Sequence, residues 1–285
     1  MPPELKINHR TLQINGLDMH VLIAGEGAPL LLLHGFPDSA QLWRKMIPDL
    51  AAAGFQVIAP DQRGYGLTSA PAETNAYRIE TIVADAIALL DALEVPTASV
   101  MGHDWGAVIG WALAAEHPER FNAYVAVSVG HPGAYMSASL EQKLKGWYVL
   151  MFQMRGIAEA LFRAGNFRAL RQTDGGIGEA EHWIADLSRP GRLTAALNWY
   201  RANFSGMLGA RPQRVAIPVL GVWSTRDVAL SEDQMTGSDR FIDGEFSYAR
   251  VEGAGHWIPL ERPGELAALA IPFLNSARTK GLDAG

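Results

Sequence analysis

Short apolar runs alternate with helical patterns in the part of the chain that precedes residue 132. The apolar runs predict strands at 21–24, 30–33, 57–59, 99–101 and 124–129. The last four are almost continuously apolar, as strands buried on both faces of a parallel sheet are. Between them, Val83, Ile87 and Leu90 follow the spacing of an amphipathic helix. This alternation predicts an α/β sheet.

From residue 132 to residue 212 the pattern changes to helical, aromatic-rich segments with few strand signals. Glycine and proline at 130–133 and at 209–212 predict a hinge at each end of this segment. Strands resume at 219–223 and 246–251, and a last helix with an expected kink at Pro272 follows. The simplest prediction is a core domain of 1–131 and 213–285, interrupted by a helical cap domain of 132–212.

Composition narrows the partners that we expect. The chain has 285 residues, 48% of them hydrophobic, and a net charge of −6, so we expect neither nucleic acid nor a strongly anionic substrate. It has no cysteine, which excludes disulfides and thiol catalysis. No apolar run approaches the roughly 18 residues of a membrane span, and the eight histidines show no paired metal-ligand spacing. We therefore expect a cytoplasmic protein with no membrane partner and no metal site.

The sequence GHDWG at 102–106 follows a predicted strand and precedes a helical pattern. Small residues on both sides of Asp104 suit the sharp turn of a nucleophile elbow, which leaves no room for larger side chains. Most enzymes with this turn carry a serine that needs a base, whereas a carboxylate is already ionised at neutral pH. The alternative is that Asp104 is an exposed residue that caps the following helix.

Asp227 and His256 each follow one of the later predicted strands, at the edge where ligands of open α/β sheets gather. With Asp104 they stand in the order nucleophile, acid, histidine that such an elbow requires. Taken singly, Asp227 is also typical of a surface turn and His256 of a hydrogen-bonded packing residue. The HGFP turn at 34–37 follows another strand. A backbone N–H of that turn and the one of Trp105 would form an oxyanion hole.

Longer segments carry a family resemblance, at 34–44 (HGFPDSAQLWR), 61–69 (DQRGYGLTS), 102–107 (GHDWGA) and 255–263 (GHWIPLERP). In these segments the chain resembles the epoxide hydrolases with an aspartate nucleophile. The resemblance implies an α/β-hydrolase fold, with a mostly parallel central sheet flanked by helices and an inserted helical cap. It also implies a cis bond between Phe36 and Pro37. In the cap, WYVLMFQ and LNWYR resemble the segments with the family's paired tyrosines, here Tyr148 and Tyr200, although either tyrosine alone is typical of core packing.

The reaction that this resemblance implies converts an epoxide into a vicinal diol and needs no cofactor. The carboxylate attacks an epoxide carbon while the tyrosines donate to the epoxide oxygen, and the histidine then activates a water that hydrolyses the ester. The residues with implied roles are the nucleophile Asp104, the donors Tyr148 and Tyr200, the base His256 with Asp227, and the oxyanion-hole residues Phe36 and Trp105. The aromatic cap favours an apolar or aryl epoxide as the small-molecule substrate, and a homodimer is left open.

Two other functions stay open on the sequence. A haloalkane dehalogenase uses the same nucleophile, base and acid, and Trp105 with Trp147 would then hold the halide. Against it, Phe36 stands where many dehalogenases have asparagine or an acidic residue. A non-catalytic ligand-binding protein of this fold would need no complete set of acid, base and donors. A serine esterase is disfavoured, because GxSxG occurs nowhere in the chain.

Overall fold

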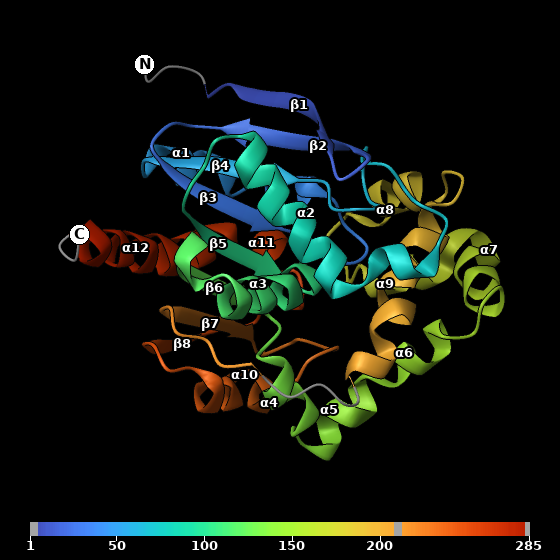
Figure 1. Ribbon diagram of the computed structural model, residues 1–285. Helices are drawn as coiled ribbons and strands as arrows, with labels where there is room; N and C mark the ends of the chain where they lie inside the picture. The colour runs from blue at the N-terminus through green and yellow to red at the C-terminus, as the bar shows by residue number, and fades with distance from the viewer. Residues whose placement is uncertain (1–4, 208–212, 283–285) are drawn as a thin grey trace.

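The structure is a computed structural model that describes residues 5–207 and 213–282. Its centre is an eight-stranded sheet with the strand order β1-β2-β4-β3-β5-β6-β7-β8 (Figure 1). β1 pairs antiparallel with β2 and β2 with β4, whereas the remaining neighbours are parallel. The strands are β1 (Ile7–Ile14), β2 (Leu17–Ala24), β3 (Ala28–Leu33), β4 (Phe55–Pro60), β5 (Ala98–His103), β6 (Phe121–Val127), β7 (Val219–Ser224) and β8 (Phe246–Val251).

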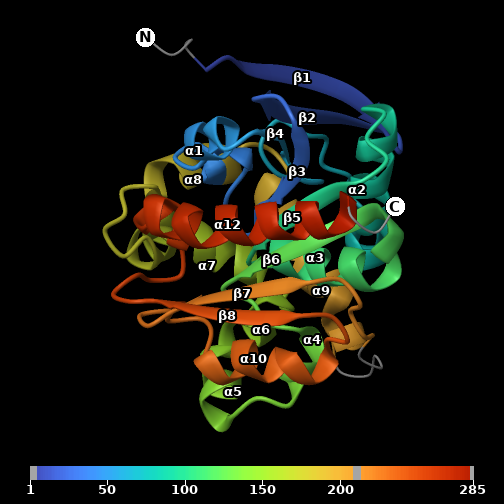
Figure 2. The same ribbon diagram turned by 90° about the vertical axis from the view of Figure 1, so that its left-hand side faces the viewer.

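Helices cover both faces of the sheet, so the expected α/β architecture is confirmed. On one face α2 (Ile79–Ala92) and α3 (Trp105–Glu116) pack together, and on the other α12 (Pro263–Leu282) contacts α1 (Ile47–Ala52) and α11 (Ile258–Glu261). Figure 2 shows α12 lying across the sheet, in front of it in that view, while α3 lies behind. The remaining core elements are α10 (Glu232–Thr236) and the short 3₁₀ helices η1 (Ala40–Trp43), η2 (Thr74–Tyr77), η3 (Pro118–Arg120) and η4 (Gly237–Phe241).

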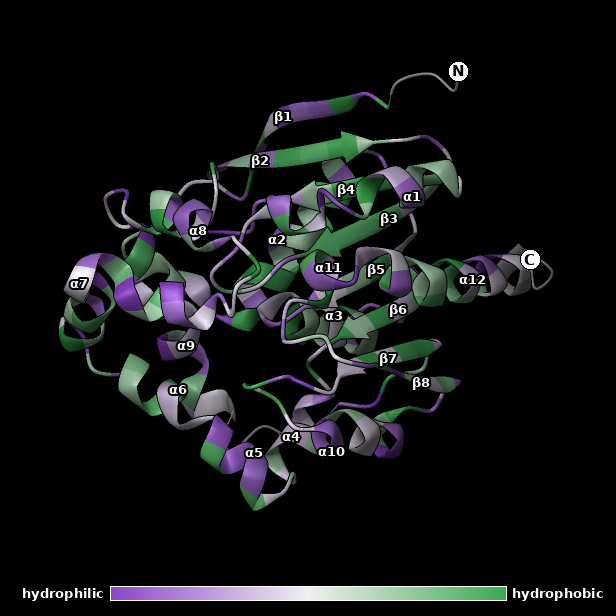
Figure 3. Ribbon diagram, turned by 180° about the vertical axis from the view of Figure 1, so that it is seen from behind, coloured by the Kyte–Doolittle hydropathy of each residue, from purple (hydrophilic) through white to green (hydrophobic). Residues whose placement is uncertain are grey.

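The central strands form because their side chains are apolar on both faces. In β3 the run from Leu30 to Leu33 is fully buried, which is the pattern of a strand covered by helices on both sides. β1 was not predicted. Its side chains are almost all exposed, and Ile14 alone is buried, because it is an edge strand whose polar residues give no apolar signal. Figure 3 shows this difference in colour between β1 and the centre of the sheet.

The seven strands that the sequence predicts are present, most of them longer than predicted, and two boundaries need comment. β2 begins at Leu17, before the predicted start. β6 ends at Val127 and not at Val129. The reason is Ser128, whose φ of 70° lies in the left-handed region and turns the chain out of the sheet. The last helix, α12, has Pro272 in its interior, and the kink expected there stays a prediction.

Between β6 and β7 the described residues form helices and no strand beyond a single bridge at Val215. The predicted hinge at 130–133 coincides with the start of α4, whereas the one at 209–212 lies outside the described residues. The cap helices are α4 (Pro132–Met136), α5 (Leu140–Lys145), α6 (Trp147–Phe152), α7 (Ile157–Thr173), α8 (Ala180–Leu187) and α9 (Arg192–Met207). In Figure 1 α6, α7, α8 and α9 stand to the right of the sheet, and α4 and α5 lie below it.

Indole hydrogen bonds tie the cap to core loops near the carboxyl ends of the strands. Trp183 of α8 donates its Nε1–H to Oδ2 of Asp38, at 3.1 Å. Trp199 of α9 donates its Nε1–H to the carbonyl of Arg63, at 3.0 Å. Because Asp38 follows β3 and Arg63 follows β4, these contacts hold the cap over the edge of the sheet at which the site lies.

Candidate active site

Asp104 lies in the sharp turn between β5 and α3. Its φ of 53° is a value that residues other than glycine rarely adopt. Glycines make the turn possible, because a Cβ atom at Gly106 would lie 2.0 Å from the carbonyl oxygen of Leu33, and one at Gly102 would lie 2.3 Å from that of Gly106. The Asp104 side chain makes no capping hydrogen bond to the helix that follows. The turn therefore presents the carboxylate at the end of β5.

The loop after β3 lies against this carboxylate, because β3 and β5 are neighbouring parallel strands. The backbone N–H of Phe36 donates to Oδ1 of Asp104, at 2.7 Å. A Cβ atom at position 35 would lie 2.2 Å from the same oxygen, so Gly35 allows the approach. The bond between Phe36 and Pro37 is cis, which confirms that expectation. Trp105, whose backbone N–H is expected to form the oxyanion hole with that of Phe36, is the first residue of α3.

His256 lies between two carboxylates. Its Nδ1 is 2.8 Å from Oδ2 of Asp227, and its Nε2 is 3.7 Å from Oδ2 of Asp104. The other oxygen of Asp227 accepts the N–H groups of Ala229 and Leu230, at 2.8 and 2.9 Å. The loops after β5, β7 and β8 thus bring together the three side chains that the sequence singled out. Both carboxylate oxygens of Asp227 have hydrogen-bond partners.

The charges at this point shift the pKa values of the acid and the imidazole in opposite directions. Burial opposes ionisation of Asp104, but its interaction with His256 lowers the pKa of the carboxyl below its ordinary value. Burial also opposes protonation of His256, yet the charge of Asp227 and the contact with Asp104 raise its pKa to about 10. At neutral pH the site therefore holds an imidazolium between two carboxylates.

Two residues that sequence reasoning missed fix the main chain of His256. Its carbonyl oxygen faces Nε2 of His103 at 2.9 Å and accepts the hydroxyl of Ser128 at 3.0 Å. Both side chains are buried. Nothing in the residue types signals this arrangement, because a bond to a backbone carbonyl places no demand on the sequence of the loop that accepts it.

Tyr148 of α6 and Tyr200 of α9 lie near Asp104, from the cap side. Their ring centroids are 6.3 Å apart, and the ring of Tyr200 is 5.1 Å from that of Trp105. Burial, and after it the charge of Asp104, raise the pKa of both hydroxyls well above the ordinary value. Both side chains are therefore neutral hydrogen-bond donors at neutral pH.

A cavity of about 490 Å³ joins these groups. Asp104, Tyr148 and Tyr200 line it together, and one face of α3 supplies an apolar wall. Tyr135 of α4 lines it as well, and its hydroxyl belongs to a third tyrosine that the sequence analysis did not single out. The sequence position of Tyr135, shortly after β6, could have identified it as a cavity residue, because loops that follow the strands at that edge of the sheet approach the ligand.

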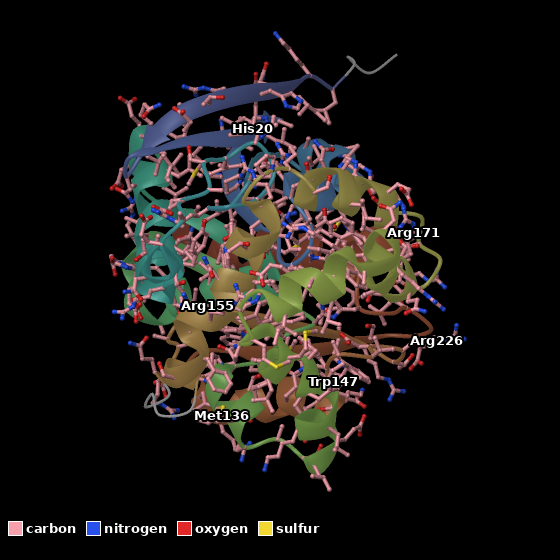
Figure 4. The ribbon with its side chains drawn as sticks, turned by 90° about the vertical axis from the view of Figure 1, so that its right-hand side faces the viewer. His20, Met136, Trp147, Arg155, Arg171 and Arg226 are labelled. Atoms are coloured by element: carbon pink, nitrogen blue, oxygen red, sulfur yellow. The ribbon has the colours of Figure 1, made fainter. Side chains whose placement is uncertain are left out.

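Trp147 does not take part in this cavity. Its side chain is 65% exposed, and Figure 4 shows it on the outer surface of the cap. The neighbouring Tyr148 of the same helix instead lines the cavity together with Asp104. The halide pair of Trp105 and Trp147 that a dehalogenase would require is therefore not assembled.

Within residues 5–207 and 213–282, no three histidine, aspartate or glutamate side chains are grouped so that they could hold a metal ion. In the same part of the chain, no helix is long and apolar enough to cross a membrane.

Comparison with known proteins places the chain and its fold in a family. Residues 28–263 match the family described as alpha/beta hydrolase fold. The chain is 33% identical to epoxide hydrolase A of Mycobacterium tuberculosis, over 93% of this chain and 96% of that one. It is 35% identical to the AB hydrolase superfamily protein YfhM of Bacillus subtilis, over 92% and 96%.

Solved structures agree with this placement. The crystal structure of epoxide hydrolase A from Mycobacterium thermoresistibile superposes with a TM-score of 0.83 at 30% identity, covering 95% of this chain and 98% of that one. The epoxide hydrolase VrEH1 of Vigna radiata superposes with a TM-score of 0.82 at 29% identity, covering the same two shares. The chain therefore belongs to the α/β hydrolase family, in the branch that contains the epoxide hydrolases.

Proposed function

We propose that this protein is an epoxide hydrolase that forms a covalent ester on Asp104. The observation that carries the proposal is a carboxylate at the turn after β5, with the N–H of Phe36 on one oxygen and the ring of His256 3.7 Å from the other. A carboxylate needs no base to be nucleophilic. The names of the relatives support a strained epoxide as the group that it attacks.

In the first step Oδ2 of Asp104 attacks one epoxide carbon, and the bond from that carbon to the epoxide oxygen breaks. The hydroxyls of Tyr148 and Tyr200 donate hydrogen bonds to the epoxide oxygen, where negative charge develops, and one of the two gives that oxygen its proton. Donors that face the developing charge stabilise the transition state more than the substrate. Their raised pKa values support this role, because a neutral tyrosine is the form that donates.

In the second step water attacks the carbonyl carbon of the ester. Esterification removes the charge of Asp104, which is one of the groups that raise the pKa of His256. The pKa of the imidazole therefore falls when the ester forms, so the ring returns a proton to the tyrosine and becomes a base at the moment that a base is required. Asp227 orients the ring, which takes a proton from the attacking water. The N–H groups of Phe36 and Trp105 hold the oxyanion. When the intermediate collapses, the bond from the carboxyl carbon to the diol oxygen breaks, the new carboxyl group gives its proton to that oxygen, and the diol leaves the Asp104 carboxylate behind.

The cavity supports an apolar or aryl epoxide as the substrate. Its volume of about 490 Å³ lies in the range of small-molecule sites, and Val108, Trp111 and Ala112 give its α3 wall an apolar surface. In this proposal residues 132–212 form the cap domain that supplies the tyrosines. The core domain of 1–131 and 213–285 supplies the nucleophile and the base.

A parallel assay with styrene oxide and 1-chlorobutane tests this function against the dehalogenase alternative. Diol release from styrene oxide without chloride release from 1-chlorobutane is the expected result. Chloride release with untouched epoxide would assign the site to haloalkanes. The exposed position of Trp147 supports the first outcome, because a halide site needs N–H donors that face the nucleophile.

A further inference from the structure

Three consecutive helices of the cap, α5, α6 and α7, expose large apolar side chains. We call this set the cap stripe and define it by the large hydrophobic residues of these helices that are more than half exposed, which are Leu140, Leu144, Trp147, Leu150, Ile157 and Leu161. In the rest of the described chain, only Leu67 and Val228 are large hydrophobic residues of comparable exposure. Exposed apolar side chains are common singly, but a contiguous group of them marks an interaction surface.

The cap stripe follows from the two-sided character of these helices. Within α5 and α6 its members recur every three or four residues, which keeps them on one side of a helix. Val149 and Phe152 of α6 face the opposite way and are buried. The same pattern explains why the sequence predicts no membrane partner, because polar residues interrupt the apolar positions and no long apolar run forms.

Basic side chains accompany the cap stripe. From Leu140 to Thr173 the chain has six lysine or arginine residues and two acidic ones, whereas the whole chain has a net charge of −6. Within the described chain, the exposed Lys143, Arg163 and Arg168 take part in no ion pair. Arg155 is exposed as well and appears with Trp147 on the face that Figure 4 turns to the viewer. The surface is thus apolar and locally positive on an acidic protein.

These positive charges favour an anionic lipid surface over a second copy of the chain as the partner that covers the cap stripe. A symmetric dimer through this face would bring each free cation of one copy toward the cations of the other, since such an interface pairs the same surface with itself, and like charges in contact are unfavourable. An anionic lipid surface instead offers negative headgroups to the cations. It also offers an interface in which tryptophan and leucine side chains are stable.

We propose that the cap stripe docks the protein peripherally on an anionic lipid surface. Trp147 and Leu150 enter the interface, while Lys143 and Arg163 contact the headgroups. α6 then faces lipid on one side and the cavity on the other, through Tyr148 and Val149. An apolar ligand dissolved in the bilayer would in this way have a short path to the site.

Co-sedimentation of the full-length protein with vesicles tests this proposal. Vesicles of phosphatidylcholine mixed with phosphatidylglycerol should bind the protein, vesicles of phosphatidylcholine alone should bind it weakly, and added salt should release it. Leu150→Gln should weaken binding about tenfold, because one buried leucine is lost from the interface. Arg163→Gln should weaken it about fivefold.

Leu67→Gln is the matched control, since Leu67 is 63% exposed, Leu150 is 62% exposed, and Leu67 lies in the core domain. This variant should bind as the wild type does, and thermal unfolding should show all three variants to be folded. Equal binding by Leu67→Gln and Leu150→Gln would overturn the proposal. So would no binding to either vesicle, or a dimer seen by light scattering that Leu150→Gln dissociates. No turnover enters the test, so its failure leaves the proposed reaction standing.

Discussion

The core and the cap hold their parts of the site in different ways. On the core side, hydrogen bonds fix each charged group, as in the contacts of Asp104 with Phe36 and of Asp227 with His256. On the cap side, Tyr200 packs by ring contacts with Phe152 and Trp105, at centroid distances of 4.7 and 5.1 Å. Charges in a buried site need fixed partners because an unpaired charge is costly. A neutral hydroxyl on a packed helix can follow the shape of a substrate at smaller cost.

The largest effect should come from the core. Replacing His256 with glutamine removes the base and leaves the nucleophile, so we expect ester formation to continue and turnover to fall by about 10²- to 10⁴-fold. Intact mass spectrometry should then show the protein heavier by one substrate mass. An unmodified protein with normal turnover would contradict the role of His256.

The next largest effect should come from the cap. Tyr148→Phe and Tyr200→Phe should each slow ester formation by about ten- to a hundredfold, because each removes one hydrogen bond to developing charge. Rapid-quench measurement of a single turnover separates this step from hydrolysis, which should keep its rate. Tyr135→Phe is the control, since Tyr135 lines the same cavity and has no role in the proposed step. A double variant of Tyr148 and Tyr200 that opens epoxides at the wild-type rate would remove the cap from the mechanism.

A smaller effect concerns the electrostatic coupling within the core. Asp104→Asn removes one of the charges that raise the pKa of His256 to about 10. The ring should therefore titrate at lower pH in this variant, and NMR of labelled histidine measures the shift. In the wild type the raised pKa stabilises the folded state fully below pH 6.5, and this contribution is lost as the pH rises toward 10. The variant should lose less stability over the same range. An unchanged titration would show that Asp104 does not control the base.

The smallest effect should come from the support of His256. Ser128→Ala removes one hydrogen bond to its carbonyl, and His103 still contacts the same atom. We expect the free energy of unfolding to fall by about 1 kcal/mol, with turnover reduced only a few fold. Urea unfolding measures the first quantity and steady-state kinetics the second. A loss of turnover as large as that of His256→Gln would make Ser128 part of the chemistry.

The sequence predicted the core part of the arrangement better than the cap part. Asp227 and His256 could be placed because each follows an apolar run, and parallel strands bring their carboxyl ends to one edge. The prediction of Tyr148 and Tyr200 depended on a family resemblance. An aromatic residue on an amphipathic helix gives the same sequence pattern whether its side chain faces the core or the site. Trp147 shows the difficulty, because it was proposed as a halide donor and lies on the outer surface.

Three other features of the structure could not be predicted from the amino-acid sequence alone. β1 is polar along most of its length, and the supports of His256 act on a backbone carbonyl. The end of β6 depends on one residue, Ser128, with a left-handed backbone that its residue type does not announce. These features depend on which segments become neighbours in space.

One measurement tests the central claim, that water attacks a carboxyl ester on the protein. A single turnover of excess wild-type protein with styrene oxide is run in heavy-oxygen water, and the peptide that contains Asp104 is then analysed by mass spectrometry. The account predicts the label in the carboxylate of Asp104, because the attacked carbon belongs to that side chain, and none in the first diol released. Label in the diol alone would show that water opens the epoxide directly, and would contradict the account.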